Sequence, residues 1–226
     1  MLNTALRPLT TRMLAQSAYE ELRDLIVTGE ISPGTRIHVD ELAKRWEISR
    51  TPVREAISRL ALVDLVTITR NSRTEVTQWS PRDMLERVEL IASLAAAAIP
   101  RLCGGPVKKA RRTTVEGSTE VHDFLALCQA MLACSDRRVS RSAVAAHFAP
   151  VAAGFYTTEV AHRFGVDLGT DAVERRRLVE ELDDAIRAEA PDRIRSAIES
   201  YLRALARAHP GESADPHSRC DVHAHA

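Results

Sequence analysis

Hydrophobic residues near the start of the chain recur every three to four positions, and the run ends at Gly29. This spacing places them on one face of an amphipathic helix, and a glycine commonly follows the last turn of a helix. A helix is therefore predicted over residues 13–28. Its hydrophobic face consists of Leu14, Ala18, Leu22, Leu25 and Ile26.

Two shorter helices are predicted after the turn signal Pro33-Gly34. The first begins near Asp40, because acidic side chains stabilise the amino end of a helix. In the second, Ser49 is a capping type of residue, and Pro52 lies in the first turn, where its missing N–H is not needed. Two short helices joined by a few residues are the organisation of a helix-turn-helix. The buried face of the second helix is predicted to be Val53, Ala56, Ile57 and Leu60.

The hydrophobic period then changes from that of a helix to that of a strand. Residues 71–73 are the predicted tip of a β-hairpin, although they lack the glycine that a tight turn prefers. A hairpin directly after the second helix makes a winged helix-turn-helix. The inward-facing residues of this wing are predicted to be Val66, Ile68, Val76 and Trp79.

From Ser80-Pro81 onward the pattern is helical, with breaks at prolines and glycines. The fold class is therefore mainly α: an amino-terminal winged helix-turn-helix with a small β-hairpin wing, followed by an all-α helical bundle. Further helices are predicted over about 118–134, 140–164, 171–188 and 191–208. The predicted divisions are a flexible arm (1–12), a winged domain (13–79), a helical domain (80–208) and a disordered tail (209–226).

Charge and cysteine content narrow the class of protein. The 31 Lys and Arg residues balance 31 Asp and Glu residues, so any affinity for a polyanion must come from a local patch. The four cysteines are far apart in a chain too large to need disulfides, and no run approaches the roughly 18 apolar residues of a membrane span. We therefore expect a cytoplasmic protein without membrane contact.

A local basic patch is predicted on the open face of the second helix. Arg50 and Arg54 are one helical turn apart, Thr51 lies beside them, and the hydrophobic residues face the other way. Any single arginine is more simply a solvated charge, but a helix-turn-helix with a basic face and a basic wing favours DNA. Arg59 is left out, because Glu55 one turn earlier could pair with it. The candidate DNA-binding residues are Arg45, Arg50, Thr51, Arg54, Arg70 and Arg73.

The motifs "GEISPGTRI", "ELA" and "SRTPVREA" resemble the amino-terminal winged helix of the GntR family of bacterial transcription regulators, over about residues 15–78. The resemblance implies that Arg50, Thr51 and Arg54 contact bases and phosphates, with further contacts from the wing tip.

This chain departs from the family pattern at three positions. Glu47 and Asp64 stand where a glycine is common, and Arg73 stands where the wing usually has glycine. These departures concern the geometry of the turn and the wing rather than the presence of the motif.

The helical half is similar to the FadR-like (FCD) ligand-sensing domain over about residues 82–206, most clearly in "LVEELDDAIRAEAPDRIRSAIESYL". In that family an aspartate and three histidines bind a divalent metal that holds a carboxylate effector. The corresponding residues here are Asp123, Leu127, Val179 and Tyr201, which are not a donor set that a transition metal prefers.

We therefore expect no metal and no cofactor. The carboxylate-binding arginine of the family is also lost, with Glu89 near its place. A neutral, apolar or cationic effector, or none, is favoured over a carboxylate. The candidate effector pocket is Glu89, Asp123, Leu127, Val179 and Tyr201, although satisfied contacts between helices explain Asp123 and Tyr201 equally well.

The sequence thus predicts a ligand-responsive transcriptional repressor that binds a palindromic operator as a homodimer, with the helical domain for ligand sensing and dimerisation. No nucleophile elbow, phosphate-binding loop or zinc-protease motif is present, so no catalytic residue is proposed and an enzyme is not expected. Two alternatives stay open. One is a regulator that has lost effector sensing, and the other is a helical-bundle metal-binding protein or enzyme with an accessory interaction module.

Overall fold

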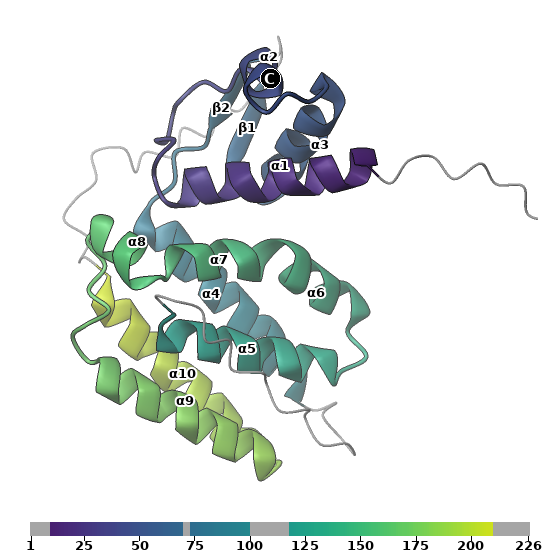
Figure 1. Ribbon diagram of the computed structural model, residues 1–226. Helices are drawn as coiled ribbons and strands as arrows, with labels where there is room; N and C mark the ends of the chain where they lie inside the picture. The colour runs from purple at the N-terminus through teal and green to yellow at the C-terminus, as the bar shows by residue number, and fades with distance from the viewer. Residues whose placement is uncertain (1–9, 70–72, 100–117, 210–226) are drawn as a thin grey trace, which may run out of the picture.

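The computed structural model describes residues 10–69, 73–99 and 118–209, and Figure 1 shows them as two packed parts. The first part contains three helices and one hairpin: α1 (Thr10–Val27), α2 (Val39–Arg45), α3 (Arg50–Ala61), β1 (Val66–Thr69) and β2 (Arg73–Val76). The second part is helical: α4 (Pro81–Ala96), α5 (Glu120–Ala133), α6 (Arg138–Ala143), the π-turn η2 (Val144–Phe148), α7 (Ala149–Phe155), α8 (Thr158–Arg163), α9 (Ala172–Arg187) and α10 (Pro191–Ala208).

The predicted fold class is confirmed. The helix-turn-helix pair α2 and α3 is followed by a hairpin, and α1 packs along α3. The face of α3 that the hydrophobic spacing predicts as buried is buried. Because α1 begins at Thr10, residues 10–12 of the predicted arm are helical; the rest of the arm, Arg70, residues 71–72 and the tail from 210 lie outside the described residues.

The wing is an antiparallel pair in which Val66 lies opposite Val76 and Thr69 opposite Arg73. Val66 and Val76 are buried at the base of the hairpin, as predicted, but the prediction for Ile68 is wrong, since 49% of its surface is exposed. The helices cover the base of the hairpin, and Ile68 lies toward its tip. The buried position across from Ile68 is Thr74, whose carbonyl accepts a hydrogen bond from the Ile37 N–H.

The turn after α2 closes in a left-handed conformation at Glu47, with φ 54°. The Ile48 N–H donates to the Ala43 carbonyl at 3.0 Å, and the Glu47 N–H donates to the Lys44 carbonyl at 3.3 Å. This is the Schellman arrangement that usually places glycine at the left-handed position. Asp64 after α3 also has a positive φ, of 61°. Both are positions at which the resemblance to the GntR family predicts a glycine.

We expect Glu47→Gly to raise the free energy of unfolding by about 0.5–1 kcal/mol, because it removes the steric cost of a left-handed non-glycine residue. Urea unfolding followed by circular dichroism measures the change. The matched control is Glu41→Gly, an exposed position inside α2, which should instead lower stability by about 1 kcal/mol. A lower stability for Glu47→Gly would contradict the assigned turn strain.

The helical part agrees with the predicted helices except over residues 140–164, where one helix is predicted and the chain forms α6, η2, α7 and α8. The π-turn η2 ends at Phe148, two residues before Pro150, whose missing N–H interrupts the helical hydrogen-bond ladder. Thr157 then begins α8 by accepting a hydrogen bond from the Val160 N–H. At the start of the bundle, α4 is capped as the Ser80-Pro81 pattern predicts: the Ser80 side chain accepts a hydrogen bond from the Asp83 N–H, and the Asp83 carboxylate accepts one from the Ser80 N–H.

The two parts meet at the carboxyl end of α1. The ring of Trp79 packs on Phe164, with 4.8 Å between ring centroids, and lies edge-on to Phe155 of α7. Arg163 donates to the Thr28 carbonyl at 2.6 Å. In Figure 1, α1 accordingly lies between the hairpin and α7.

A second junction contact joins α4 to the end of α3. Arg87 donates to the Val63 carbonyl at 2.7 Å, and burial lowers the pKa of its guanidinium. The orientation of α3 is therefore tied to the bundle through both α1 and α4. Among the described helices, none has the length and apolar character of a membrane span.

Candidate nucleic-acid interface

The α3 helix separates its hydrophobic and polar residues onto two faces. Val53, Ala56 and Leu60 are buried in the core, whereas Arg50, Thr51 and Arg54 are exposed. Because Thr51 lies in the first turn, its hydroxyl is close to the amino end of the helix, which carries a partial positive charge. The structure thus brings the three predicted α3 residues together on one open surface.

Arg54 and Arg45 are both exposed, and within the described part of the chain neither has an ion-pair partner. Arg45 ends α2 and Arg54 lies one turn into α3, so both border the turn between these helices. An exposed guanidinium without a carboxylate partner can bind phosphate or fork onto a guanine edge.

Arg50 differs, because its Nε lies 2.8 Å from an Asp40 carboxylate oxygen. Both side chains are more than 60% exposed, at 63% and 67%. An exposed pair of this kind is weak, so a phosphate can replace Asp40 as the partner of Arg50.

We expect Asp40→Asn to strengthen binding to duplex DNA about threefold at low salt, since it removes one negative charge from this surface and releases Arg50. Fluorescence anisotropy of a labelled duplex, titrated at several salt concentrations, measures the effect. The matched control is Asp192→Asn, which breaks a similarly exposed pair with Arg195 in the bundle. Equal affinities for Asp40→Asn and the unmodified chain at low salt would refute the masking role of Asp40.

The wing contributes one described basic residue. Arg73 is exposed and its Nε lies 2.8 Å from a Glu75 oxygen on the same strand. Arg70 lies outside the described residues. The structure therefore places Arg73 at the outer end of the hairpin, bound to a neighbouring carboxylate.

Arg59 points away from the open face. The sequence suggests a pair with Glu55, but the Arg59 guanidinium lies over the ring of Tyr19 in α1, 4.1 Å from the centroid. Burial raises the pKa of the Tyr19 hydroxyl, so the ring stays neutral. Arg59 thus links α3 to α1 and does not join the exposed arginines on the open face of α3. The spacing of residues in the sequence could not predict this contact.

The family model described as "Bacterial regulatory proteins, gntR family" matches residues 14–76, which cover α1, the helix-turn-helix and the hairpin. Residues 14–76 are a GntR-family helix-turn-helix domain. The GntR domain of this chain thus includes the helix-turn-helix that carries the exposed face of α3.

Curated relatives share mainly this part. An HTH-type transcriptional regulator in the TAR-I ttuE-ttuC' intergenic region of Agrobacterium vitis is 34% identical over 106 residues, 46% of this chain and 62% of that protein. The Nta operon transcriptional regulator of Aminobacter aminovorans is 31% identical over 101 residues, 45% of each chain. The matches therefore span 45% to 62% of the length of these relatives.

Solved structures extend the likeness to the bundle. E. coli McbR/YncC aligns with 86% of this chain and 95% of its own, with TM-score 0.54 and 18% identity. A GntR-type protein from Rhodococcus sp. RHA1 aligns with 85% of this chain and 96% of its own, with TM-score 0.55 and 22% identity. At such identities the likeness concerns the fold, a GntR domain followed by helices. The FCD assignment of the bundle stays a prediction.

The five residues of the predicted effector pocket come from α4, α5, α9 and α10. Tyr201 is fully buried and stacks on Phe124 with 4.0 Å between ring centroids, and its hydroxyl has no hydrogen-bond partner among the described residues. Burial raises the pKa of this hydroxyl well above its usual value. Leu127 and Val179 are buried, whereas Glu89 and Asp123 are half-buried. Their role as a pocket stays a prediction.

The sequence analysis missed an ion pair in the bundle core. Arg175 of α9 is 0% exposed, Glu120 of α5 is 4% exposed, and their side chains meet at 2.5 Å. Arg175 also donates to the carbonyls of Leu168 and Thr170. In the sequence, Glu120 is an acidic residue at the start of a helix, and Arg175 is one of three consecutive arginines. Neither pattern predicts that the side chain is buried. Among the described residues, no group of three or more His, Cys, Asp or Glu could hold a metal ion.

Proposed function

We propose that this chain is a DNA-binding transcriptional regulator whose recognition surface is the exposed face of α3. The observation that carries the proposal is the exposed set Arg50, Thr51 and Arg54 on the second helix of the helix-turn-helix in a GntR domain. The relatives from Agrobacterium vitis and Aminobacter aminovorans are named as transcriptional regulators, which supports the same class.

The chemistry of the surface suits a major groove. A helix of 12 residues fits the groove of B-form DNA, and its amino-terminal residues reach the base edges. Arg54 can donate two parallel hydrogen bonds to a guanine, and Thr51 can donate to a phosphate. Arg45, which ends α2, and Arg73, at the outer end of the hairpin, would contact the flanking phosphates.

We further propose that the regulator acts as a homodimer on a palindromic operator and represses transcription in a ligand-responsive manner. One helix-turn-helix covers only a half-site, so a two-fold pair of GntR domains would match two half-sites about one helical turn apart. The alternative within this class is a regulator that has lost effector sensing.

Selection of bound sequences from a pool of random duplexes tests the proposal. The expected result is enrichment of a palindromic motif, bound more weakly as the salt concentration rises, because phosphate contacts release counterions. Analytical ultracentrifugation of the selected complex should give two chains per duplex. The proposal fails if the purified chain binds no duplex even at low salt.

A further inference from the structure

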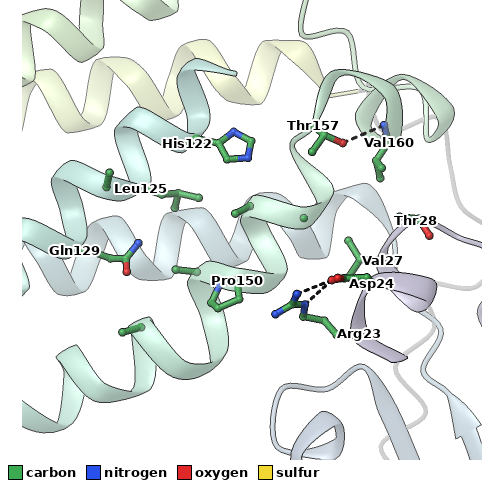
Figure 2. A pocket seen from close by; sticks show the side chains of 15 residues that line it. Arg23, Asp24, Val27, Thr28, His122, Leu125, Gln129, Pro150, Thr157 and Val160 are labelled. Carbon is green, nitrogen blue, oxygen red and sulfur yellow. Dashed lines mark hydrogen bonds and ion pairs between the residues drawn. The ribbon is translucent and has the colours of Figure 1, made fainter. Parts of the chain in front are cut away.

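A cavity lies at the junction between the GntR domain and the bundle. Its floor is α7, and its two walls are α5 on one side and the carboxyl half of α1 on the other (Figure 2). Its volume is about 610 Å³, within the range of sites that hold small organic molecules. None of the five residues of the predicted effector pocket lines it.

The cavity is mainly apolar and its charges cancel. The floor consists of small residues, including Ala149, Ala153 and Gly154, which leave room above the helix. The charged residues of the lining are Arg23 and Asp24, whose side chains pair with each other at 2.7 Å. A ligand with a net charge would therefore meet no uncompensated partner, and an uncharged ligand fits better.

Two polar side chains on the α5 wall give the cavity hydrogen-bonding capacity. The Nδ1 atom of His122 accepts from the Thr119 N–H at 3.1 Å, so the proton of the neutral ring lies on Nε2 and is available to a ligand. The Gln129 amide, about two helical turns further along α5, can also donate. Both groups suit a hydrogen-bond acceptor such as a carbonyl oxygen.

We propose that this cavity binds a neutral, mainly apolar small molecule that carries a hydrogen-bond acceptor, and that its occupancy changes the DNA affinity of the GntR domain. The second half of the proposal rests on the proposed DNA-binding function. The proposed site lies between the GntR domain and the bundle, whereas the five residues of the predicted effector pocket lie inside the bundle.

The α1 helix provides the physical link between the cavity and α3. Arg23 lines the cavity, and its guanidinium lies 5.9 Å from the centroid of the Tyr19 ring. Arg59 of α3 lies over the same ring at 4.1 Å. A molecule that contacts both α1 and α5 therefore favours the orientation of α3 that accompanies this packing. If the bound molecule changes the affinity for DNA by some factor, DNA must change the affinity for that molecule by the same factor.

The test of the site uses the full chain without DNA and the neutral naphthyl ketone dye 6-propionyl-2-(dimethylamino)naphthalene. We expect its emission to shift to shorter wavelength and to saturate at one dye per chain. Ala153→Phe, which fills the floor, should weaken dye binding roughly tenfold or more. The control Ala146→Phe adds the same ring at an exposed position of η2 outside the lining and should leave binding unchanged.

Two further variants keep the test decisive. Ala126→Met fills the cavity from the α5 wall and should also weaken dye binding, even if Ala153→Phe does not fold. Gln129→Leu keeps the size of the side chain but removes its donor, and should weaken binding of the ketone. The site is refuted if dye binding does not saturate, or if the filling variants bind the dye as tightly as Ala146→Phe.

A labelled duplex from the selection then tests the coupling. Saturating dye should change the DNA dissociation constant by about fivefold or more, and DNA should change the dye affinity by the same factor. The Ala153→Phe chain should bind DNA without responding to dye. An unchanged DNA affinity overturns the coupling, whereas dye binding without any DNA binding refutes the proposed function and leaves the site intact.

Discussion

Arg175→Met is expected to lower the free energy of unfolding by about 3–5 kcal/mol, the largest effect of any single substitution proposed for this chain. The substitution leaves the Glu120 carboxylate at a position that is 4% exposed, without its cation. It also removes the donors to the Leu168 and Thr170 carbonyls. Urea unfolding followed by circular dichroism measures the loss.

The size of this effect comes from the buried charge that is left behind. Replacing both members of a buried pair by apolar residues is often close to neutral, whereas removing one member is costly. Glu120→Leu combined with Arg175→Met should therefore recover more than half of the stability that Arg175→Met loses. A double-substitution cycle with Glu120→Leu alone separates the pairwise contribution.

The next residue along the helix offers a matched control for Arg175. Arg176 is exposed on α9, so Arg176→Met should change the free energy of unfolding by no more than about 0.5 kcal/mol. If Arg175→Met and Arg176→Met were equally stable, the ion pair would not be a support of the bundle. If Arg175→Met were too unstable to purify, Glu120→Gln would still report the loss of the charged pair.

The GntR domain could be predicted from the sequence because its determinants are local. The spacing of Val53, Ala56 and Leu60 defines the buried face of α3, and the exposed arginines follow from the same helical period. Ser80 and Asp83 likewise cap α4 within a single turn. Such patterns need no knowledge of which elements pack together.

Other features depend on contacts between segments that are distant in the chain, and local patterns do not record them. Glu120 and Arg175 are 55 positions apart, and each alone looks like a surface charge. Ile68 has the strand period of a core residue, but 49% of its surface is exposed, beyond the buried pair Val66 and Val76 at the base of the hairpin. The cavity needs α1, α5 and α7 together, so the sequence gives no reason to group its lining residues.

Arg54→Ala is expected to weaken specific DNA binding about 10- to 100-fold, equivalent to roughly 1–3 kcal/mol, if the guanidinium forks onto a base. Arg54 is exposed, so its loss should leave the thermal unfolding midpoint unchanged. Anisotropy titrations with the selected duplex and a scrambled duplex, each at several salt concentrations, measure the specific and non-specific affinities. The contact to a base predicts a loss that is confined mostly to the selected duplex.

Arg54→Lys separates base reading from simple charge. Lysine keeps the positive charge but lacks the planar fork of donors, so it should preserve the salt dependence of binding without restoring full specificity. Arg176→Ala, which removes an arginine from the bundle surface, should leave both affinities unchanged. If Arg54→Ala bound the selected duplex as tightly as the unmodified chain, α3 would have to be discarded as the reading helix. If instead Arg54→Lys bound like the unmodified chain, Arg54 would be a phosphate contact, and the specificity would have to come from other residues of the domain.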